Sequence, residues 1–147
     1  MFMGNLEHLY RQVIMDHYKS PFNKGLVSDP TYFTVNLHNP SCGDDMTVQI
    51  KESNGIVTDI KHEGTGCSIC CSSASVMSIT LMNKTKQQAL DIIHAYYHML
   101  TNEPYDQTIL NGDALAYHGV AQFPARIKCA TLAWKATEQA LLANKEE

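Results

Sequence analysis

Residues 45–63 read DMTVQIKESNGIVTDIKHE and carry the clearest structural signal in the chain. Apolar and polar residues alternate in the first half of this stretch, as they do in a half-buried strand. Asn54-Gly55 then separates it from a second extended run over 56–63, and this dipeptide is the strongest short-range signal of a β-hairpin. A third alternating segment covers residues 32–39. The sequence therefore predicts a small antiparallel sheet of three strands.

The segments around these strands have helical periodicity instead. Thr85-Lys86-Gln87-Gln88 has the form of a capping box, and Pro124 suits the first turn of a helix. Helices are expected over 5–19, from 67 to 81 with Cys70, Ala74, Met77 and Leu81 on one face, from 86 to 100, and from 124 to 143, with a short helix at 114–117. The expected fold class is α+β, with the sheet packed against several helices.

Composition limits the kind of protein this is. A chain of 147 residues with 44% hydrophobic residues can bury a core without disulfides, so we expect one domain over 1–147. The net charge of −4 comes without a basic stripe, which argues against nucleic acid as a partner. No segment has the length of a membrane span or the pattern of a signal peptide, so we expect no membrane and a cytoplasmic location.

Three of the five cysteines lie in motifs typical of turns or helix starts. In a reducing compartment such cysteines are metal ligands, reactive thiols or core residues more often than disulfides. The motifs read NPSCGD at 39–44, GTGC at 64–67 and FPARIKC at 123–129.

These motifs supply three thiols and a carboxylate, a donor set that binds zinc tetrahedrally. Gly43 separates Cys42 from Asp44 and gives the backbone freedom to turn both side chains toward one ion. Cys67 and Cys129 fall near helix N-termini, which stabilise thiolates. The sequence therefore predicts one zinc site formed by Cys42, Asp44, Cys67 and Cys129.

A competing arrangement is the Cys67-x-x-Cys70 pair, because such pairs chelate zinc or form redox disulfides. Cys70 continues an apolar helix face, where a reduced cysteine behaves as a small core residue. We therefore expect Cys70 to be structural, and we assign Cys71 no chemical role. Zinc deaminases need His-x-Glu and Pro-Cys-x-x-Cys, and the chain has neither.

Four segments together resemble the IscU/NifU-N family of iron-sulfur cluster assembly proteins. They are 9–18 (LYRQVIMDHY), 39–44, 64–69 (GTGCSI) and 124–130 (PARIKCA), and they extend over nearly the whole chain. The resemblance implies an α+β fold with three cysteines and one aspartate at one end of the molecule.

Within this family the chain looks like the SufU-type branch, because Lys128 stands where the scaffold branch has histidine. A longer segment between Cys67 and Cys129 points the same way. The resemblance implies a zinc cofactor, a partner in a SufS-type cysteine desulfurase, and Cys42 as the thiol that accepts persulfide sulfur. Cys70 and Cys71 depart from the branch and leave open a further thiol role.

Two cations close to Cys129 complete the set of candidate site residues. Arg126 and Lys128 are expected to offset the negative charge of the thiolates, and Arg126 is the better suited to fixed ion pairing. Two other functions stay open on the sequence. One is a scaffold that assembles an iron-sulfur cluster on the same ligands, binding iron in place of zinc, and passes it to apoproteins or a downstream scaffold. The other is a purely structural zinc module.

Overall fold

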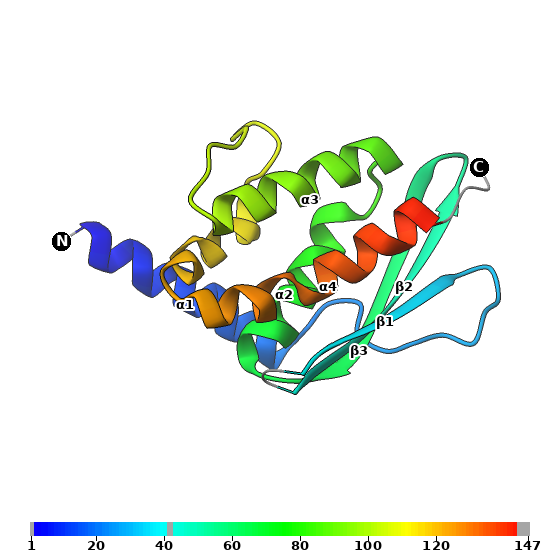
Figure 1. The fold of residues 1–147 in the computed structure, drawn as a ribbon, viewed down its shortest axis with the longest axis horizontal. Coiled ribbons are helices and arrows are strands. Elements are labelled where there is room, and N and C mark those ends of the chain that lie inside the picture. Colours follow the sequence, from blue (N-terminus) through cyan, green and yellow to red (C-terminus); the bar gives the residue numbers. More distant parts are fainter. Residues whose placement is uncertain (1, 41–42, 144–147) are drawn as a thin grey trace.

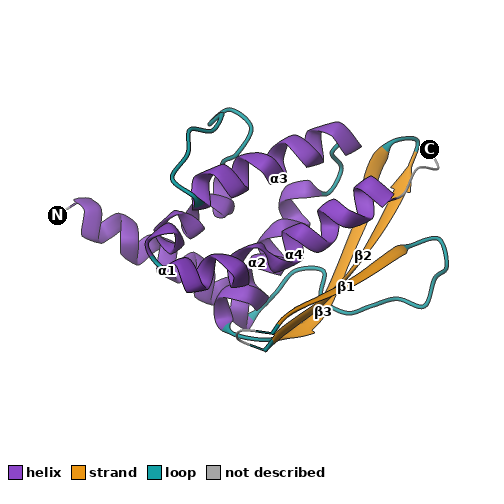
Figure 2. Ribbon diagram, in the orientation of Figure 1, coloured by secondary structure: helices purple, strands orange, loops and turns teal. Residues whose placement is uncertain are grey.

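The computed structural model describes residues 2–40 and 43–143, with side chains from residue 7 onward. It has the expected α+β fold, in which the helices lie on one side of a three-stranded antiparallel sheet (Figure 1, Figure 2). The elements in chain order are α1 (Phe2–Lys19), β1 (Phe33–Asn39), β2 (Asp44–Ser53), β3 (Ile56–Thr65), α2 (Ser68–Leu81), α3 (Lys86–Leu100), the 3₁₀ helix η1 (Gly112–Gln122) and α4 (Pro124–Ala143).

The sheet has the order β1-β2-β3, and the predicted hairpin is confirmed. Asn54 and Gly55 both adopt positive φ, at 55° and 78°, as a tight hairpin turn requires. Antiparallel pairing places Asp45 opposite Thr65 at the other end of the two strands. The start of β2 and the end of β3 therefore meet at one corner of the sheet, where the candidate ligands Asp44 and Cys67 also lie.

The helices form two layers on the sheet. α4 contacts β1 and β2 and α2 contacts β3, while α1, α3 and η1 pack against these two helices. The predicted inner face of α2 is confirmed, and its four residues are fully buried at Cys70, Ala74, Met77 and Leu81. The capping box at the start of α3 is also confirmed, since the Thr85 and Gln88 side chains each bond the other's backbone N–H.

The segment before α4 is more ordered than the sequence predicts. In place of a short helix at 114–117, the 3₁₀ helix η1 covers Gly112–Gln122. Three of its four buried residues, Ala114, Tyr117 and Val120, recur every three positions. A 3₁₀ helix has three residues per turn, so this spacing turns all three toward the core. A pattern with a period of 3.6 does not fit this segment, so the sequence predicts only part of the helix.

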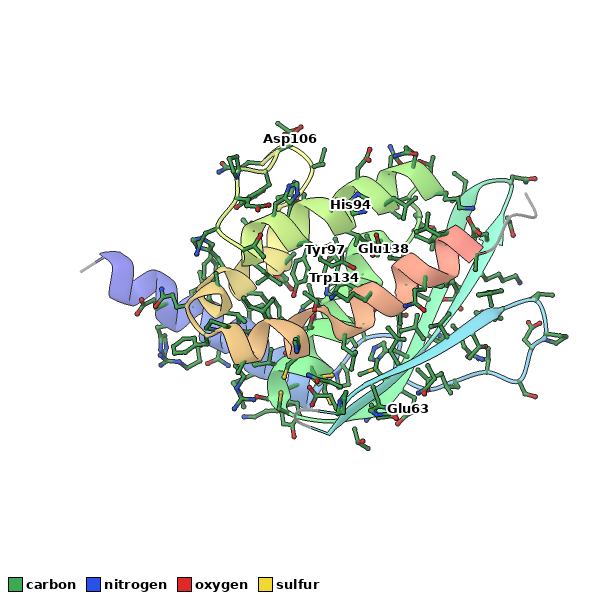
Figure 3. All side chains as sticks on the ribbon, viewed as in Figure 1. Glu63, His94, Tyr97, Asp106, Trp134 and Glu138 are labelled. Carbon is green, nitrogen blue, oxygen red and sulfur yellow. The ribbon has the colours of Figure 1, made fainter. Side chains whose placement is uncertain are left out.

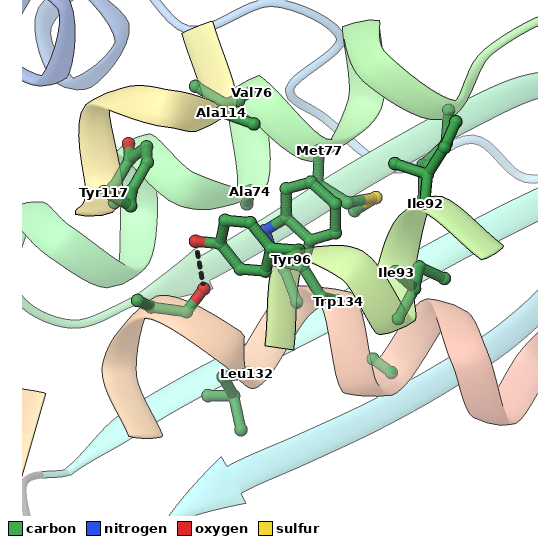
Figure 4. Close-up of a cluster of buried hydrophobic side chains, with 14 of the residues drawn as sticks. Ala74, Val76, Met77, Ile92, Ile93, Tyr96, Ala114, Tyr117, Leu132 and Trp134 are labelled. Atoms are coloured by element: carbon green, nitrogen blue, oxygen red, sulfur yellow. Dashed lines mark hydrogen bonds between the residues drawn. The ribbon is translucent and has the colours of Figure 1, made fainter. Parts of the chain in front are cut away.

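Two stacked aromatic rings form the centre of the core. The rings of Tyr96 on α3 and Trp134 on α4 lie 3.7 Å apart between centroids at an interplanar angle of 9° (Figure 4). Both side chains are fully buried. Their flat faces remove a large apolar area from water and join the two helices.

A buried polar network surrounds this stack. The Ser73 hydroxyl accepts a 2.8 Å hydrogen bond from Trp134 Nε1 and donates one of 2.6 Å to the carbonyl oxygen of Ala130. Tyr96 donates to the same carbonyl oxygen at 2.9 Å. Ala130 directly follows Cys129, so this network fixes α4 against α2 and α3 next to a candidate ligand.

Two further groups of polar contacts, around His17 and around Glu138, join elements that are distant in the sequence. The buried ring of His17 on α1 contacts Ser75 Oγ on α2 at 2.7 Å and Asp113 Oδ2 on η1 at 2.8 Å. Glu138 on α4 accepts a hydrogen bond from Tyr97 of α3 and contacts His94, as Figure 3 shows. The contact of His17 with Ser75 satisfies polar atoms that packing removes from water, whereas the contacts of Glu138 join α4 to α3 nearer the surface. Among the helices of the described chain, none is long and apolar enough to span a bilayer.

Replacing Ser73 with alanine tests the polar network. The substitution leaves the fully buried indole N–H of Trp134 without the acceptor it has here, at a cost of about 1–3 kcal/mol. We expect Ser73→Ala to lower the free energy of unfolding by that amount in urea denaturation followed by tryptophan fluorescence. Ser28→Ala, at an exposed position, is the control and should change it by less than about 0.5 kcal/mol. Equal stability of the two variants would contradict the role of Ser73.

Candidate metal centre

Asp44 is the first residue of β2 and is only 1% exposed. A carboxylate removed from water is costly unless hydrogen bonds and opposite charge compensate it. Its Oδ1 atom accepts a 3.1 Å hydrogen bond from the backbone N–H of Cys67, which orients the carboxylate toward the start of α2. Asp44 is therefore a buried anion turned toward a cysteine 23 residues away in the sequence.

Two glycines allow Asp44 and the segment before Cys67 to lie this close together. Gly66 has φ +156°, and a Cβ atom at this position would lie 2.4 Å from Asp44 Oδ1. A Cβ atom at Gly64 would lie 2.1 Å from the carbonyl oxygen of Asp45. Both distances are well inside van der Waals contact, so the two chain segments can only come this close because both residues lack a side chain. The Gly-x-Gly pattern ahead of Cys67 is the sequence signal of this constraint.

Cys67 occupies the N-cap position of α2, with an extended backbone and no side-chain capping bond. Its sulfur is therefore not used to cap the helix, and the side chain is partly exposed. Cys129 lies in the second turn of α4 and is 1% exposed.

Asp44, Cys67 and Cys129 converge in space. Their ligand atoms, one carboxylate oxygen and two sulfurs, all lie within 4.8 Å of one another. Zn–S bonds of about 2.3 Å in a tetrahedron put ligand atoms roughly 3.8 Å apart, so small movements of the side chains would fit the group around one ion. Two thiols and a buried carboxylate are also the donors that zinc prefers. The donor chemistry and the spacing both fit a zinc ion.

The fourth predicted ligand, Cys42, lies outside the described residues, as does Ser41. Its neighbour Gly43 is described and has φ +75°, a conformation that glycine adopts without strain. This is the unusual backbone conformation that we expect of the glycine between Cys42 and Asp44.

Of the two candidate cations, Arg126 is the one with contacts to the site. The negative charge of Cys67 and a hydrogen bond to the sulfur of Cys129 raise the pKa of its guanidinium above the usual value. It is exposed to solvent and offsets the charge of these two residues. Lys128 is exposed on α4, and the contacts found among the described residues do not include one between Lys128 and the site.

The remaining two cysteines differ from each other. Cys70 is fully buried in the hydrophobic core. Cys71 is partly exposed, and its sulfur lies 3.8 Å from the carbonyl oxygen of Gly66. Burial, followed by the charge of Cys67, raises the pKa of the Cys71 thiol. Neither sulfur belongs to the group of converging ligand atoms found in the described part of the chain.

The site opens to solvent on the side of Cys67. A groove of about 650 Å³ between α1, η1 and the start of α4 is lined by Tyr10, Ile14, Cys67, Phe123 and Arg126, among others. Phe123 is 61% exposed at this groove and adds an apolar ring to its rim. A smaller pocket of about 290 Å³ lies on another side of the Gly64–Gly66 segment and is lined by Cys71, Lys24 and His62, among others.

Comparison with known proteins agrees with this geometry. Residues 9–130 match the model of the NifU-like N-terminal domain. The chain is 47% identical over 146 residues to the zinc-dependent sulfurtransferase SufU of Bacillus subtilis strain 168, covering 99% of this chain and 97% of that protein. It is 36% identical over 141 residues to the iron-sulfur cluster assembly scaffold protein IscU of Streptococcus pyogenes serotype M1, covering 96% and 87%.

A solved structure is also similar throughout. It is a protein of Fervidobacterium islandicum AW-1 described as an iron-sulfur cluster assembly scaffold for the SUF system. The two structures superpose with a TM-score of 0.83 at 32% identity, over 88% of this chain and 93% of the other. The matched domain model covers the described strands and the three converging ligand candidates, so the chain belongs to the NifU-like N-terminal domain family of iron-sulfur cluster assembly proteins.

Proposed function

We propose that this protein is a zinc-dependent sulfurtransferase that accepts persulfide sulfur from a SufS-type cysteine desulfurase and delivers it for iron-sulfur cluster assembly. The observation that supports this most is the convergence of Asp44, Cys67 and Cys129 within 4.8 Å of one another. The similarity to the Bacillus subtilis SufU over 99% of the chain supports the same activity.

In this proposal the metal ligands are Cys42, Asp44, Cys67 and Cys129, and zinc is the resident ion. When bound, zinc keeps its cysteine ligands deprotonated at neutral pH. The Asp44 carboxylate is held by the backbone N–H of Cys67, and Arg126 offsets the charge of the two described cysteines. The chain thus preorganises the ligands and limits the negative charge that they gather in one place.

Cys42 is the sulfur acceptor in this proposal. Its thiolate attacks the terminal sulfur of the desulfurase persulfide, a new S–S bond forms on Cys42, and the bond to the desulfurase cysteine breaks. The desulfurase cysteine leaves as a thiolate, so the step is an exchange without net oxidation. A partly exposed Cys67 and the groove beside it leave room for a partner's polypeptide on this side of the site. The exposed ring of Phe123 offers it an apolar contact.

Replacing Cys42 with alanine tests sulfur acceptance. We expect Cys42→Ala to abolish the stimulation of desulfurase turnover, because the accepting thiol is gone. Sulfide release is measured with the desulfurase, cysteine and a reductant, and mass spectrometry locates the added sulfur on the tryptic peptide of the wild-type protein. Cys71→Ala is the matched control and should stimulate as the wild type does. Full stimulation by Cys42→Ala would show that sulfur acceptance at this residue is wrong.

The identity of the metal in protein purified without added ions separates sulfur transfer from the scaffold alternative. The sulfurtransferase proposal predicts about one zinc per chain and little iron or acid-labile sulfide, because the site holds a resident ion. Abundant iron with acid-labile sulfide would favour a scaffold. Metal analysis by mass spectrometry, with a sulfide assay on the same sample, gives the answer.

Replacing Gly66 with alanine tests the geometry of the site. A methyl group at Gly66 would lie 2.4 Å from Asp44 Oδ1 and would push the carboxylate from its place. We expect zinc affinity to fall by about 10–100-fold, the range seen when the groups that orient metal ligands are disturbed. Competition with a chromophoric chelator measures it, and circular dichroism checks that the variant is folded.

Gly119→Ala is the control for this substitution, because nothing lies within 4 Å of the added methyl group and its backbone is unstrained. It should bind zinc as the wild type does. Unchanged zinc affinity in folded Gly66→Ala would mean that the Asp44 carboxylate does not contribute to the site as we propose.

A further inference from the structure

We propose that Cys67 and Cys71 form a dithiol site that reacts with hydroperoxides, in which a reversible disulfide removes Cys67 from the metal centre. The release of zinc in this proposal rests on the proposed function, because it needs Cys67 as a zinc ligand. The disulfide itself rests only on the positions of the two cysteines.

The first turn of α2 brings the two residues together. The backbone N–H of Cys71 donates a 3.1 Å hydrogen bond to the carbonyl oxygen of Cys67, so the two residues are one helical turn apart. Side chains four residues apart lie on the same face of a helix, with Cβ atoms about 5–6 Å apart. The Cys71 sulfur lies 3.8 Å from the carbonyl oxygen of Gly66, the residue just before Cys67. It is therefore directed toward the start of the helix.

A disulfide needs a Cβ separation of about 3.5–4.5 Å, so the first turn must close by roughly 1–2 Å. Cys67 is suited to such a movement, because it is the N-cap residue. Its backbone is already extended and its side chain makes no capping bond. The first turn of a helix also has few internal hydrogen bonds to break. Closure at this point leaves the rest of α2 in place.

Among the described residues, the two other cysteines that could pair with Cys67 are less suited. Cys70 is fully buried, and its side chain belongs to the hydrophobic core between α2 and its neighbours. Cys129 has its sulfur within 4.8 Å of Cys67, but it is only 1% exposed. Hydrogen bonds to Ala130 also fix the backbone next to it. Cys71 is partly exposed and lines a pocket of about 290 Å³ through which a small oxidant reaches it.

The reaction proceeds in two balanced steps. The Cys67 thiolate attacks one oxygen of the hydroperoxide, the O–O bond breaks, and the products are a sulfenic acid on Cys67 and an alcohol or water. The Cys71 thiol then attacks the sulfenic sulfur, the S–O bond breaks, and the hydroxyl leaves with the thiol proton as water when the disulfide forms. The two thiols lose two electrons in total, which the hydroperoxide takes up. A dithiol reductant reverses the change by thiol exchange.

Hydrogen peroxide is the probe for this site. The zinc-loaded wild type, Cys71→Ala and Cys70→Ala are treated with equal peroxide in the presence of a zinc-sensitive dye, and peptide mapping without reduction locates the cross-links. We expect a Cys67–Cys71 disulfide in the wild type and in Cys70→Ala, with zinc release that dithiothreitol reverses. In Cys71→Ala we expect Cys67 to go on to sulfinic acid, so that zinc release is not reversed.

A disulfide from Cys67 to Cys70, Cys129 or Cys42 in the wild type would overturn the proposal. Free Cys71 after zinc release, or equal reversibility in Cys71→Ala, would overturn it as well. Peptide mapping of metal-free protein tests the disulfide independently of the proposed function. We expect the Cys67–Cys71 link to form in metal-free protein whether or not the chain transfers sulfur. A Cys67–Cys71 link that forms without loss of zinc would leave the disulfide standing and refute Cys67 as a ligand.

Discussion

The hydrogen bond from the backbone N–H of Cys67 to the buried carboxylate of Asp44 is the contact on which the candidate centre depends. It joins the start of β2 to the start of α2 at the corner of the sheet where β3 ends. Like charges at this range repel, so two thiolates and a carboxylate gathered there need a positive charge beside them. A divalent cation compensates this negative charge better than solvent does, because Asp44 and Cys129 are almost entirely buried.

The fold supplies the rigidity that such a centre needs. Antiparallel pairing of β2 with β3 sets the distance between Asp44 and the Gly64–Gly66 segment, and the absence of side chains at both glycines lets them approach. On the other side, the stack of Tyr96 on Trp134 and the hydrogen bonds of Ser73 hold the backbone that carries Cys129. Ligands from three separate elements are therefore fixed by packing before any metal binds. Exposed groups lie at the open side, where Cys67, Arg126 and Phe123 line a groove.

Much of this architecture follows from local sequence rules. The Asn54-Gly55 turn and the capping box at Thr85 are specified by residues within a few positions of each other, and both are confirmed. The convergence of Asp44 with Cys67 and Cys129 was expected from motif chemistry and from a resemblance to a family. The contacts of His17 with Ser75 and Asp113 were not expected from the sequence, because they join residues 58 and 96 positions apart. No local pattern specifies such pairs. The sequence predicts the 3₁₀ helix only in part, because its period of three differs from the helical period of 3.6 and its sequence contains two glycines.

Burial gives the two adjacent cysteines Cys70 and Cys71 different roles. They are adjacent in sequence, yet one is enclosed in the core and the other lies beside the metal centre. The apolar helix face predicted the first outcome, whereas the partial exposure of Cys71 and the contact of its sulfur with the carbonyl oxygen of Gly66 are apparent only in the structure. In the proposed dithiol site, this placement lets Cys67 react with hydroperoxides as well as bind the metal.

The central claim is that one zinc ion is held by three sulfurs and one oxygen. X-ray absorption spectroscopy at the zinc edge, on protein as purified, tests it most directly. The account predicts three sulfur neighbours at about 2.3 Å and one lighter neighbour at about 2.0–2.2 Å, with the lighter one lost or replaced in Asp44→Ala. A shell of four sulfurs, or a spectrum unchanged by Asp44→Ala, would contradict it.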